Sequence, residues 1–213
     1  MQPETQAAHL AHHFPDLRTQ ENAARLGMWL FLATEVLLFT ALFTAYTVYR
    51  YLFAETFNEA SRLMDTSLGA ANTLVLLTSS LTAALAVYYA RRGQARRSAA
   101  LLAATLAFAA GFMVIKAFEY GHHFHEGQLP GRFYAYPELQ LPGASMFFTL
   151  YFLMTGVHGL HVLIGMGVLT FLMVRTLRGG YSTAYSTPVE LGVLYWHLVD
   201  LIWIFLFPLL YLI

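Results

Sequence analysis

The residues that could do chemistry are few, and they interrupt long apolar stretches at helical spacing. The segment 195–203 reads YWHLVDLIW and places His197 and Asp200 three residues apart, on one side of a helix. His158 and His161 repeat that spacing in an earlier stretch. Ionisable groups at membrane depth are costly, so they usually face protein or an internal cavity and often mark function. The pattern predicts polar side chains that turn inward within a membrane bundle.

Three other ionisable residues lie within apolar stretches. Glu35 falls near the middle of the first one. It could be a neutral glutamic acid that bonds to a neighbouring helix, or a carboxyl group that exchanges protons or contacts lipid headgroups. Lys116 and Glu119 are three residues apart, which predicts an ion pair on one helix face. Because Lys116 lies near one end of its stretch, its long side chain could also extend toward the headgroups.

The histidines allow two interpretations. His158 or His161 on one helix, facing His197 on another, could bind haem through both axial positions. The same residues could instead form a polar seam that braces the helices and holds a lipid headgroup, and we favour this interpretation. Further polar groups suit hydrogen bonds between helices, namely Asn72, Thr73, Thr78, Ser79, Ser80, Thr82, Trp196 and Trp203.

The composition also indicates a membrane protein. Of the 213 residues, 58% are hydrophobic and 11% are charged, about half the charge of an average soluble domain. The formal net charge is zero, which gives no electrostatic basis for nucleic-acid binding. Cysteine is absent, and this excludes iron–sulfur clusters, thiolate-bound copper or zinc, and disulfides. We expect neither a catalytic residue nor a metal ligand in this chain.

Each apolar stretch must form a helix, because an isolated strand would leave backbone groups unpaired in lipid. About twenty residues cross the hydrocarbon layer. The sequence therefore predicts an all-α, polytopic membrane protein with five transmembrane helices. Residues 1–24 form a polar tail and residues 25–213 form the bundle. The predicted spans are 26–49, 68–90, 99–120, 145–174 and 189–212.

Arginine placement predicts the orientation. The connection after the second span contains Arg91, Arg92, Arg96 and Arg97. If that connection is cytoplasmic, eight arginines lie inside and three lie outside, in agreement with the positive-inside rule. The N-terminus is then cytoplasmic and the C-terminus periplasmic, and residues 121–144 form a long periplasmic loop.

Several segments resemble subunit III of the haem–copper terminal oxidases. These are LGMWLFLATEVLLF (26–39), NTLVLLTSS (72–80), FMVIKAFEY (112–120), TGVHGLHVLIG (155–165) and YWHLVDLIWIFLF (195–207). By this resemblance Glu35 matches the family's intramembrane carboxylate, and Lys116 and Glu119 match its third-span motif. His158, His161, His197 and Asp200 match its polar signature positions. Mitochondrial-type members have seven spans, whereas this chain has five, so the cleft that holds phospholipid in the family must be bounded differently.

The resemblance implies an accessory, non-catalytic subunit of an aerobic cytochrome c oxidase that is coupled to proton translocation. It implies a bacterial inner membrane, bound phospholipid, and haem and copper only in the partner subunits. Oxidase subunits I and II would be its partners, and a larger respiratory supercomplex is compatible with it. The alternatives are subunit III of a quinol oxidase, a homologue associated with nitric oxide reductase, and a small bis-histidine haem b protein.

Overall fold

A computed structural model describes residues 10–183 and 185–212. Its helices are α2 (Leu17–Leu52), α3 (Ala54–Arg62), α4 (Thr66–Arg91), α5 (Ala95–His125), α6 (Ala144–Leu177) and α7 (Thr187–Tyr211). A short 3-10 helix, η1, covers Gly131–Phe133. Five of these helices, α2 and α4 to α7, are long and apolar enough to cross a membrane. No strand occurs among the described residues, which confirms the all-α prediction.

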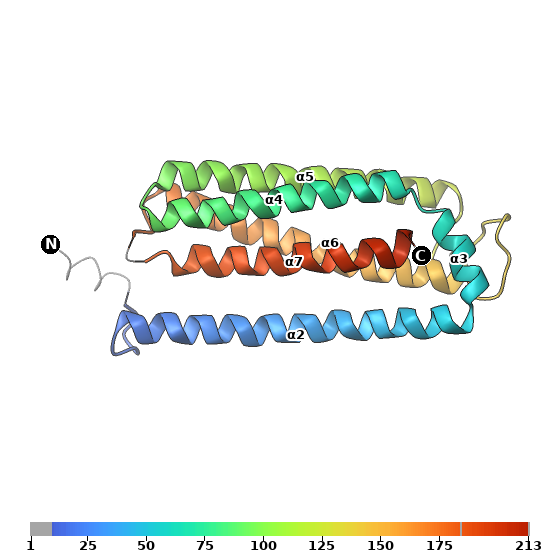
Figure 1. The fold of residues 1–213 in the computed structure, drawn as a ribbon, viewed down its shortest axis with the longest axis horizontal. Helices are drawn as coiled ribbons and strands as arrows, with labels where there is room; N and C mark the ends of the chain where they lie inside the picture. The colour runs from blue at the N-terminus through green and yellow to red at the C-terminus, as the bar shows by residue number, and fades with distance from the viewer. Residues whose placement is uncertain (1–9, 184, 213) are drawn as a thin grey trace.

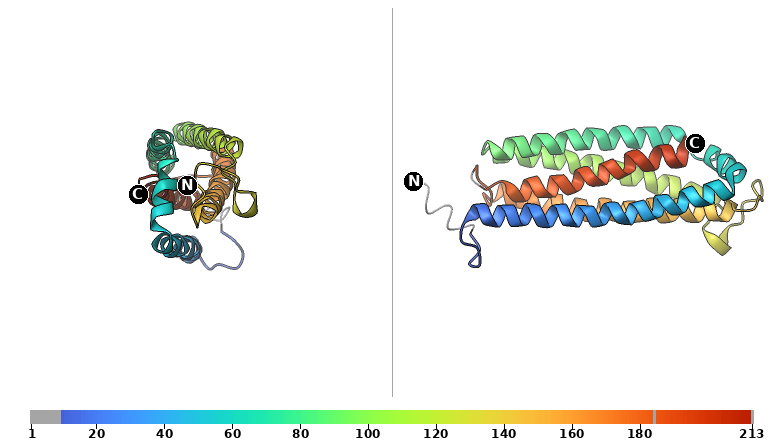
Figure 2. Two further views of the ribbon diagram at one scale, coloured as in Figure 1. Left: turned by 90° about the vertical axis from the view of Figure 1, so that its right-hand side faces the viewer. Right: turned by 60° about the horizontal axis from the view of Figure 1, so that its bottom comes forward.

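The helices form a four-helix bundle with a fifth helix at its side. The pairs α4–α5, α5–α6, α6–α7 and α4–α7 are in contact and close the bundle, while α2 packs against α6 and α7 (Figures 1 and 2). The extent of burial differs accordingly. In the most apolar 18-residue stretch of each helix, 50% of the residues are buried in α7 and 11% in α2. The helix α2 is therefore peripheral, and its position depends on few contacts.

The first span begins earlier than the sequence predicted. Asp16 caps α2 by accepting a hydrogen bond from the backbone N–H of Thr19 at 2.7 Å, so the helix starts at Leu17 rather than at residue 26. The same contact lowers the pKa of Asp16 below its usual value of 3.8. Part of the predicted polar tail is thus helical, and residues 1–9 of that tail lie outside the described residues.

Two other boundaries also differ from the prediction. The helix α5 continues to His125, into the predicted loop 121–144. Between the first two spans lies α3, in which Phe57 and Ala60 are buried. This helix was not predicted from the sequence. Its apolar residues recur at helical spacing, but they are too few to stand out beside the long apolar spans.

A close approach joins α3 to the start of α6. Gly143 precedes α6 with φ of +92°, and a Cβ atom there would lie 2.6 Å from the Phe53 ring. Only glycine suits both the backbone conformation and this contact. In the same region the Thr56 hydroxyl donates a hydrogen bond to the Pro142 carbonyl oxygen at 2.8 Å. These contacts hold the start of α3 against the start of α6, at the end of the bundle where the chain leaves α2.

Candidate functional site: a groove beside a polar bundle

An open groove of about 730 Å³ runs between α2 and α7. Its walls are aliphatic and aromatic side chains, to which His197 adds an imidazole ring. We call it the α2–α7 groove. A volume of this size and composition suits hydrocarbon chains rather than a polar ligand. The lining residues are Trp29, Leu32, Ala33, Val36, Leu37, Leu194, His197, Leu198 and Leu201.

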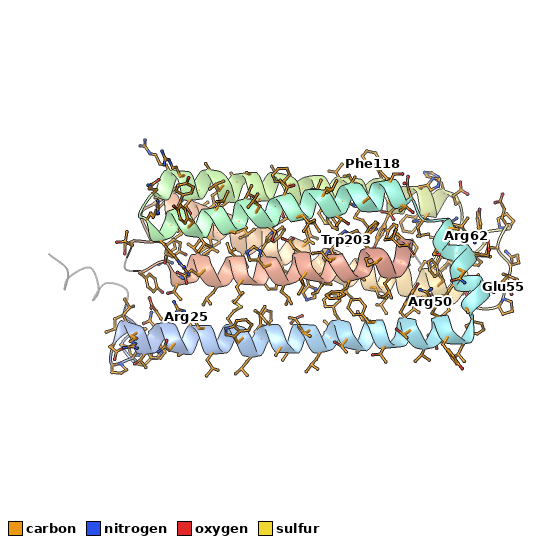
Figure 3. All side chains as sticks on the ribbon, in the orientation of Figure 1. Arg25, Arg50, Glu55, Arg62, Phe118 and Trp203 are labelled. Carbon is orange, nitrogen blue, oxygen red and sulfur yellow. The ribbon has the colours of Figure 1, made fainter. Side chains whose placement is uncertain are left out.

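One end of the α2–α7 groove is charged. An adjoining depression of about 350 Å³ shares Trp29 and His197 with the groove and is also lined by Arg25, Arg91 and Glu190. The Glu190 carboxylate accepts a hydrogen bond from Arg91 Nε at 2.9 Å and lies 3.5 Å from Arg25 Nη2. Two guanidinium groups thus face one carboxylate. The excess positive charge and the unused N–H groups suit an anionic phosphate. Arg25 is labelled at this end of α2 in Figure 3.

Glu35 joins α2 to α6 in the middle of the membrane-spanning region. Its Oε2 atom lies 2.7 Å from His161 Nε2, and the two side chains are 16% and 11% exposed. The other ring nitrogen of His161, Nδ1, lies 2.8 Å from the Val157 carbonyl oxygen. A carbonyl oxygen only accepts, so Nδ1 carries a proton. The bond to Glu35 therefore needs one further proton, which is either on the carboxyl oxygen or on Nε2.

Several hydrogen bonds join α7 to α4, and three of them lie between the ends of the two helices. The indole N–H groups of Trp196 and Trp203 donate to the hydroxyls of Ser79 and Thr73, each at 3.1 Å. The Ser80 hydroxyl lies 2.7 Å from His197 Nδ1. The interhelical role predicted for Thr73, Ser79 and the two tryptophans is confirmed. The Ser80 bond meets the same expectation, whereas Asn72, for which an interhelical hydrogen bond was also predicted, has no such partner among the described residues.

Lys116 and Glu119 form the predicted ion pair, with Nζ and Oε2 3.0 Å apart. The predicted extension of Lys116 toward the headgroups is wrong, because its side chain is buried. All three of its N–H donors find internal acceptors: Glu119, the Tyr151 hydroxyl at 3.0 Å and the Tyr211 hydroxyl at 2.9 Å. Both tyrosines also donate to Glu119. Tyr151 and Tyr211 were not among the predicted site residues; the signal that could have indicated them is that a buried tyrosine hydroxyl usually needs a partner.

Four buried side chains have no hydrogen-bond partner for any of their polar atoms among the described residues. They are Asn72 on α4, Ser98 on α5, His158 on α6 and Asp200 on α7. All four are almost completely buried. The shared helix faces predicted for His158 with His161 and for His197 with Asp200 thus lead to different surroundings. His161 contacts Glu35 and His197 contacts Ser80, whereas the other member of each pair points into the bundle.

No group of three or more histidine, aspartate or glutamate side chains suited to a metal ion is found among the described residues. His158 packs between the rings of Phe112 and Trp203, with centroids 5.6 and 5.4 Å from its own. The His161 ring contacts Glu35 and the His197 ring contacts Ser80. Neither ring is hydrogen-bonded to the other in the part of the chain that the structure describes.

Known proteins identify the family of this chain. The family model for cytochrome c oxidase subunit III matches residues 5–213. Cytochrome c oxidase subunit 3 of Bacillus subtilis is 31% identical over 187 residues, which is 88% of this chain and 84% of that protein. Quinol oxidase subunit 3 of the same organism is 32% identical over 187 residues, covering 88% and 85%.

A third relative joins two subunits in one chain. The haem–copper oxidase subunit I+III of Aeropyrum pernix is 30% identical over 200 residues, which is 89% of this chain and 22% of that protein. Five membrane-spanning helices and a family match across nearly the whole length agree with each other. This multi-pass membrane protein belongs to the haem–copper oxidase subunit III family.

Proposed function

We propose that this chain is an accessory, non-catalytic subunit of an aerobic respiratory oxidase, and that it holds phospholipid against the catalytic subunit. The observation that carries the proposal is the α2–α7 groove with its charged end. Acyl chains would lie along its apolar walls, while the phosphate would pair with Arg25 and Arg91. Haem and copper would reside in the partner subunits. This chain would contribute stability and support the supply of oxygen and protons.

Oxidase subunit I is the proposed principal partner, and the fused subunit I+III of Aeropyrum pernix supports this pairing. Subunit II would complete the complex. We place the chain in the inner membrane of a bacterium, with its N-terminus cytoplasmic. In that orientation the arginine-rich connection between α4 and α5 and the charged end of the groove lie on the cytoplasmic side.

The lipid role is testable by removing the cationic end. The double variant Arg25→Gln, Arg91→Gln should retain less phospholipid after detergent purification, as measured by mass spectrometry of the intact oxidase. Arg92→Gln is the matched control, because Arg92 stacks on the Tyr88 ring and does not line the groove. Equal lipid retention in the two variants would refute the assignment of the groove.

The accessory role requires a second comparison, of the oxidase with and without this chain. We expect the complex without it to retain its haem spectrum but to lose activity faster during turnover. Identical inactivation kinetics would contradict a supporting role. A haem Soret band in the isolated chain would favour the bis-histidine haem alternative instead.

We favour cytochrome c as the electron donor of the complex, and quinol is the second candidate. Relatives named for each donor have nearly equal identity to this chain, 31% and 32%. The donor would bind to the other subunits, so the purified complex decides between them. Oxygen consumption with reduced cytochrome c, but not with a quinol, would support the first; the reverse would establish the second.

A further inference from the structure

Three helices each carry a buried amide, imidazole or carboxyl side chain without a hydrogen-bond partner among the described residues, and the smaller Ser98 hydroxyl, near the start of α5, also lacks one. Asn72 and His158 are fully buried, and Asp200 is 3% exposed. Neither the Asn72 amide, nor either ring nitrogen of His158, nor either Asp200 oxygen has a hydrogen-bond partner among the described residues. A buried polar group normally has such a partner, from protein or from ordered water. The three larger groups among these exceptions, Asn72, His158 and Asp200, therefore call for an explanation.

The register of the helices places these groups near one another. The bonds Trp196–Ser79 and Trp203–Thr73 fix α7 against α4, and Asp200 lies between those two contacts along α7. Asn72 precedes Thr73 on α4. The Trp203 ring also packs against the His158 ring of α6, with centroids 5.4 Å apart. Trp203 thus contacts both Thr73 of α4 and His158 of α6, and Figure 3 labels it in the interior of the bundle.

A polar connection leads from these groups toward the α2–α7 groove. Asp200 and His197 lie three residues apart on one face of α7, and the Ser80 hydroxyl of α4 lies 2.7 Å from His197 Nδ1. The His197 ring lines the groove itself. Ser80 and His197 therefore stand between the interior groups and the open groove.

We propose that Asn72, His158 and Asp200 surround a cluster of internal water molecules, and that this cluster exchanges protons with the α2–α7 groove through Ser80 and His197. A buried water typically makes about three hydrogen bonds to polar groups that otherwise lack partners. Amide, imidazole and carboxyl groups together supply both donors and acceptors for it. During exchange each group passes one proton onward and receives one, so no net charge moves.

The sign of one stability change distinguishes a hydrated site from a dry one. If water bridges the three groups, Asn72→Leu removes a ligand of that water and leaves Asp200 and His158 without it. The midpoint of thermal unfolding of the assembled oxidase should then fall by about 2–4 °C. If the interior is dry, Asn72→Leu only removes an unpaired buried amide, and the midpoint should rise. Asn58→Leu, which replaces an exposed amide on α3, controls for the substitution itself.

Infrared spectroscopy provides a second measurement that does not depend on the folding of the Asn72 variant. The difference between the wild-type oxidase and Asp200→Asn identifies the carboxyl band of Asp200. After transfer to D₂O this band should shift, and His197→Phe should slow the shift, whereas Trp29→Phe, on the opposite wall of the groove, should not. A raised midpoint for Asn72→Leu, a band that does not shift in D₂O, or equal rates in the two groove variants would overturn the proposal.

Discussion

The bond between Glu35 and His161 is the polar link between α2 and the bundle at mid-membrane depth, and its replacement tests the proton assignment. Glu35→Gln keeps a side chain of the same shape with an N–H donor. Because His161 Nδ1 donates to the Val157 carbonyl, Nε2 of the neutral ring is free to accept from that amide. Glu35→Leu keeps the approximate volume but removes the hydrogen bond altogether.

The expected magnitudes follow from this difference. A hydrogen bond between membrane helices contributes about 0.5–2 kcal/mol. Its loss in Glu35→Leu should raise the fraction of molecules in which α2 has separated from α6 by about 2- to 30-fold. Glu35→Gln should cost less than about 1 kcal/mol, since a neutral hydrogen bond replaces the original one. Both variants should still assemble with the oxidase.

Spin-label distances provide the assay. The chain contains no cysteine, so Leu37→Cys and Leu201→Cys, on opposite walls of the α2–α7 groove, introduce the only two labels within it. The distance distribution of the assembled oxidase should be broadened toward longer distances by Glu35→Leu and left nearly unchanged by Glu35→Gln. If both variants broaden it equally, the interaction needs the carboxylate charge, and the neutral-bond reasoning fails. If neither does, the bond does not hold α2.

Three further predictions concern the rest of the bundle. Lys116→Met should destabilise the complex by about 3–5 kcal/mol, because it leaves the Glu119 carboxylate buried without its cation; Lys116→Met combined with Glu119→Leu should recover most of the loss in thermal unfolding. Asp16→Ala should reduce the hydrogen-exchange protection of the Thr19 amide at pH 7. Because its pKa is lowered, Asp16 stabilises the first turn of α2 above pH 3.8, and wild-type protection should fall as the pH drops through the lowered pKa. Gly165→Ala should cost about 1–3 kcal/mol, since its Cβ would lie 2.8 Å from the Trp196 ring; Gly167→Ala, with open space around it, is the control whose unfolding midpoint should not change.

The five spans could be predicted because the cost of unpaired backbone in lipid leaves only one option for a long apolar stretch. Their ends could not, since these depend on single capping contacts. The start of α2 at Leu17 depends on the bond from the Thr19 amide to Asp16, in a segment that is polar rather than apolar. Hydropathy locates the part of a helix inside the membrane but not its extension beyond it.

Side-chain partners were predictable only within one helix. The pair Lys116–Glu119 follows from the spacing of three residues alone. The same spacing in His158–His161 and His197–Asp200 gave a shared face, but only His161 and His197 have a hydrogen-bond partner on a neighbouring helix. A rotation of about 300° over three residues leaves some 60° between two side chains, which is enough for one to meet an adjacent helix while the other turns inward.

The peripheral position of α2 explains why a groove remains open between α2 and α7. Contacts at successive heights hold this helix: Arg25 with Glu190, Glu35 with His161, and the Tyr46 hydroxyl with the Leu209 carbonyl at 2.7 Å. Between them, the apolar walls toward α7 remain open. Hydrocarbon from a lipid would fill this space at little cost, because lipid chains are as apolar as the leucines they would touch. A subunit built in this way combines polar links that fix the helix with an apolar gap of the kind that the proposed lipid would fill.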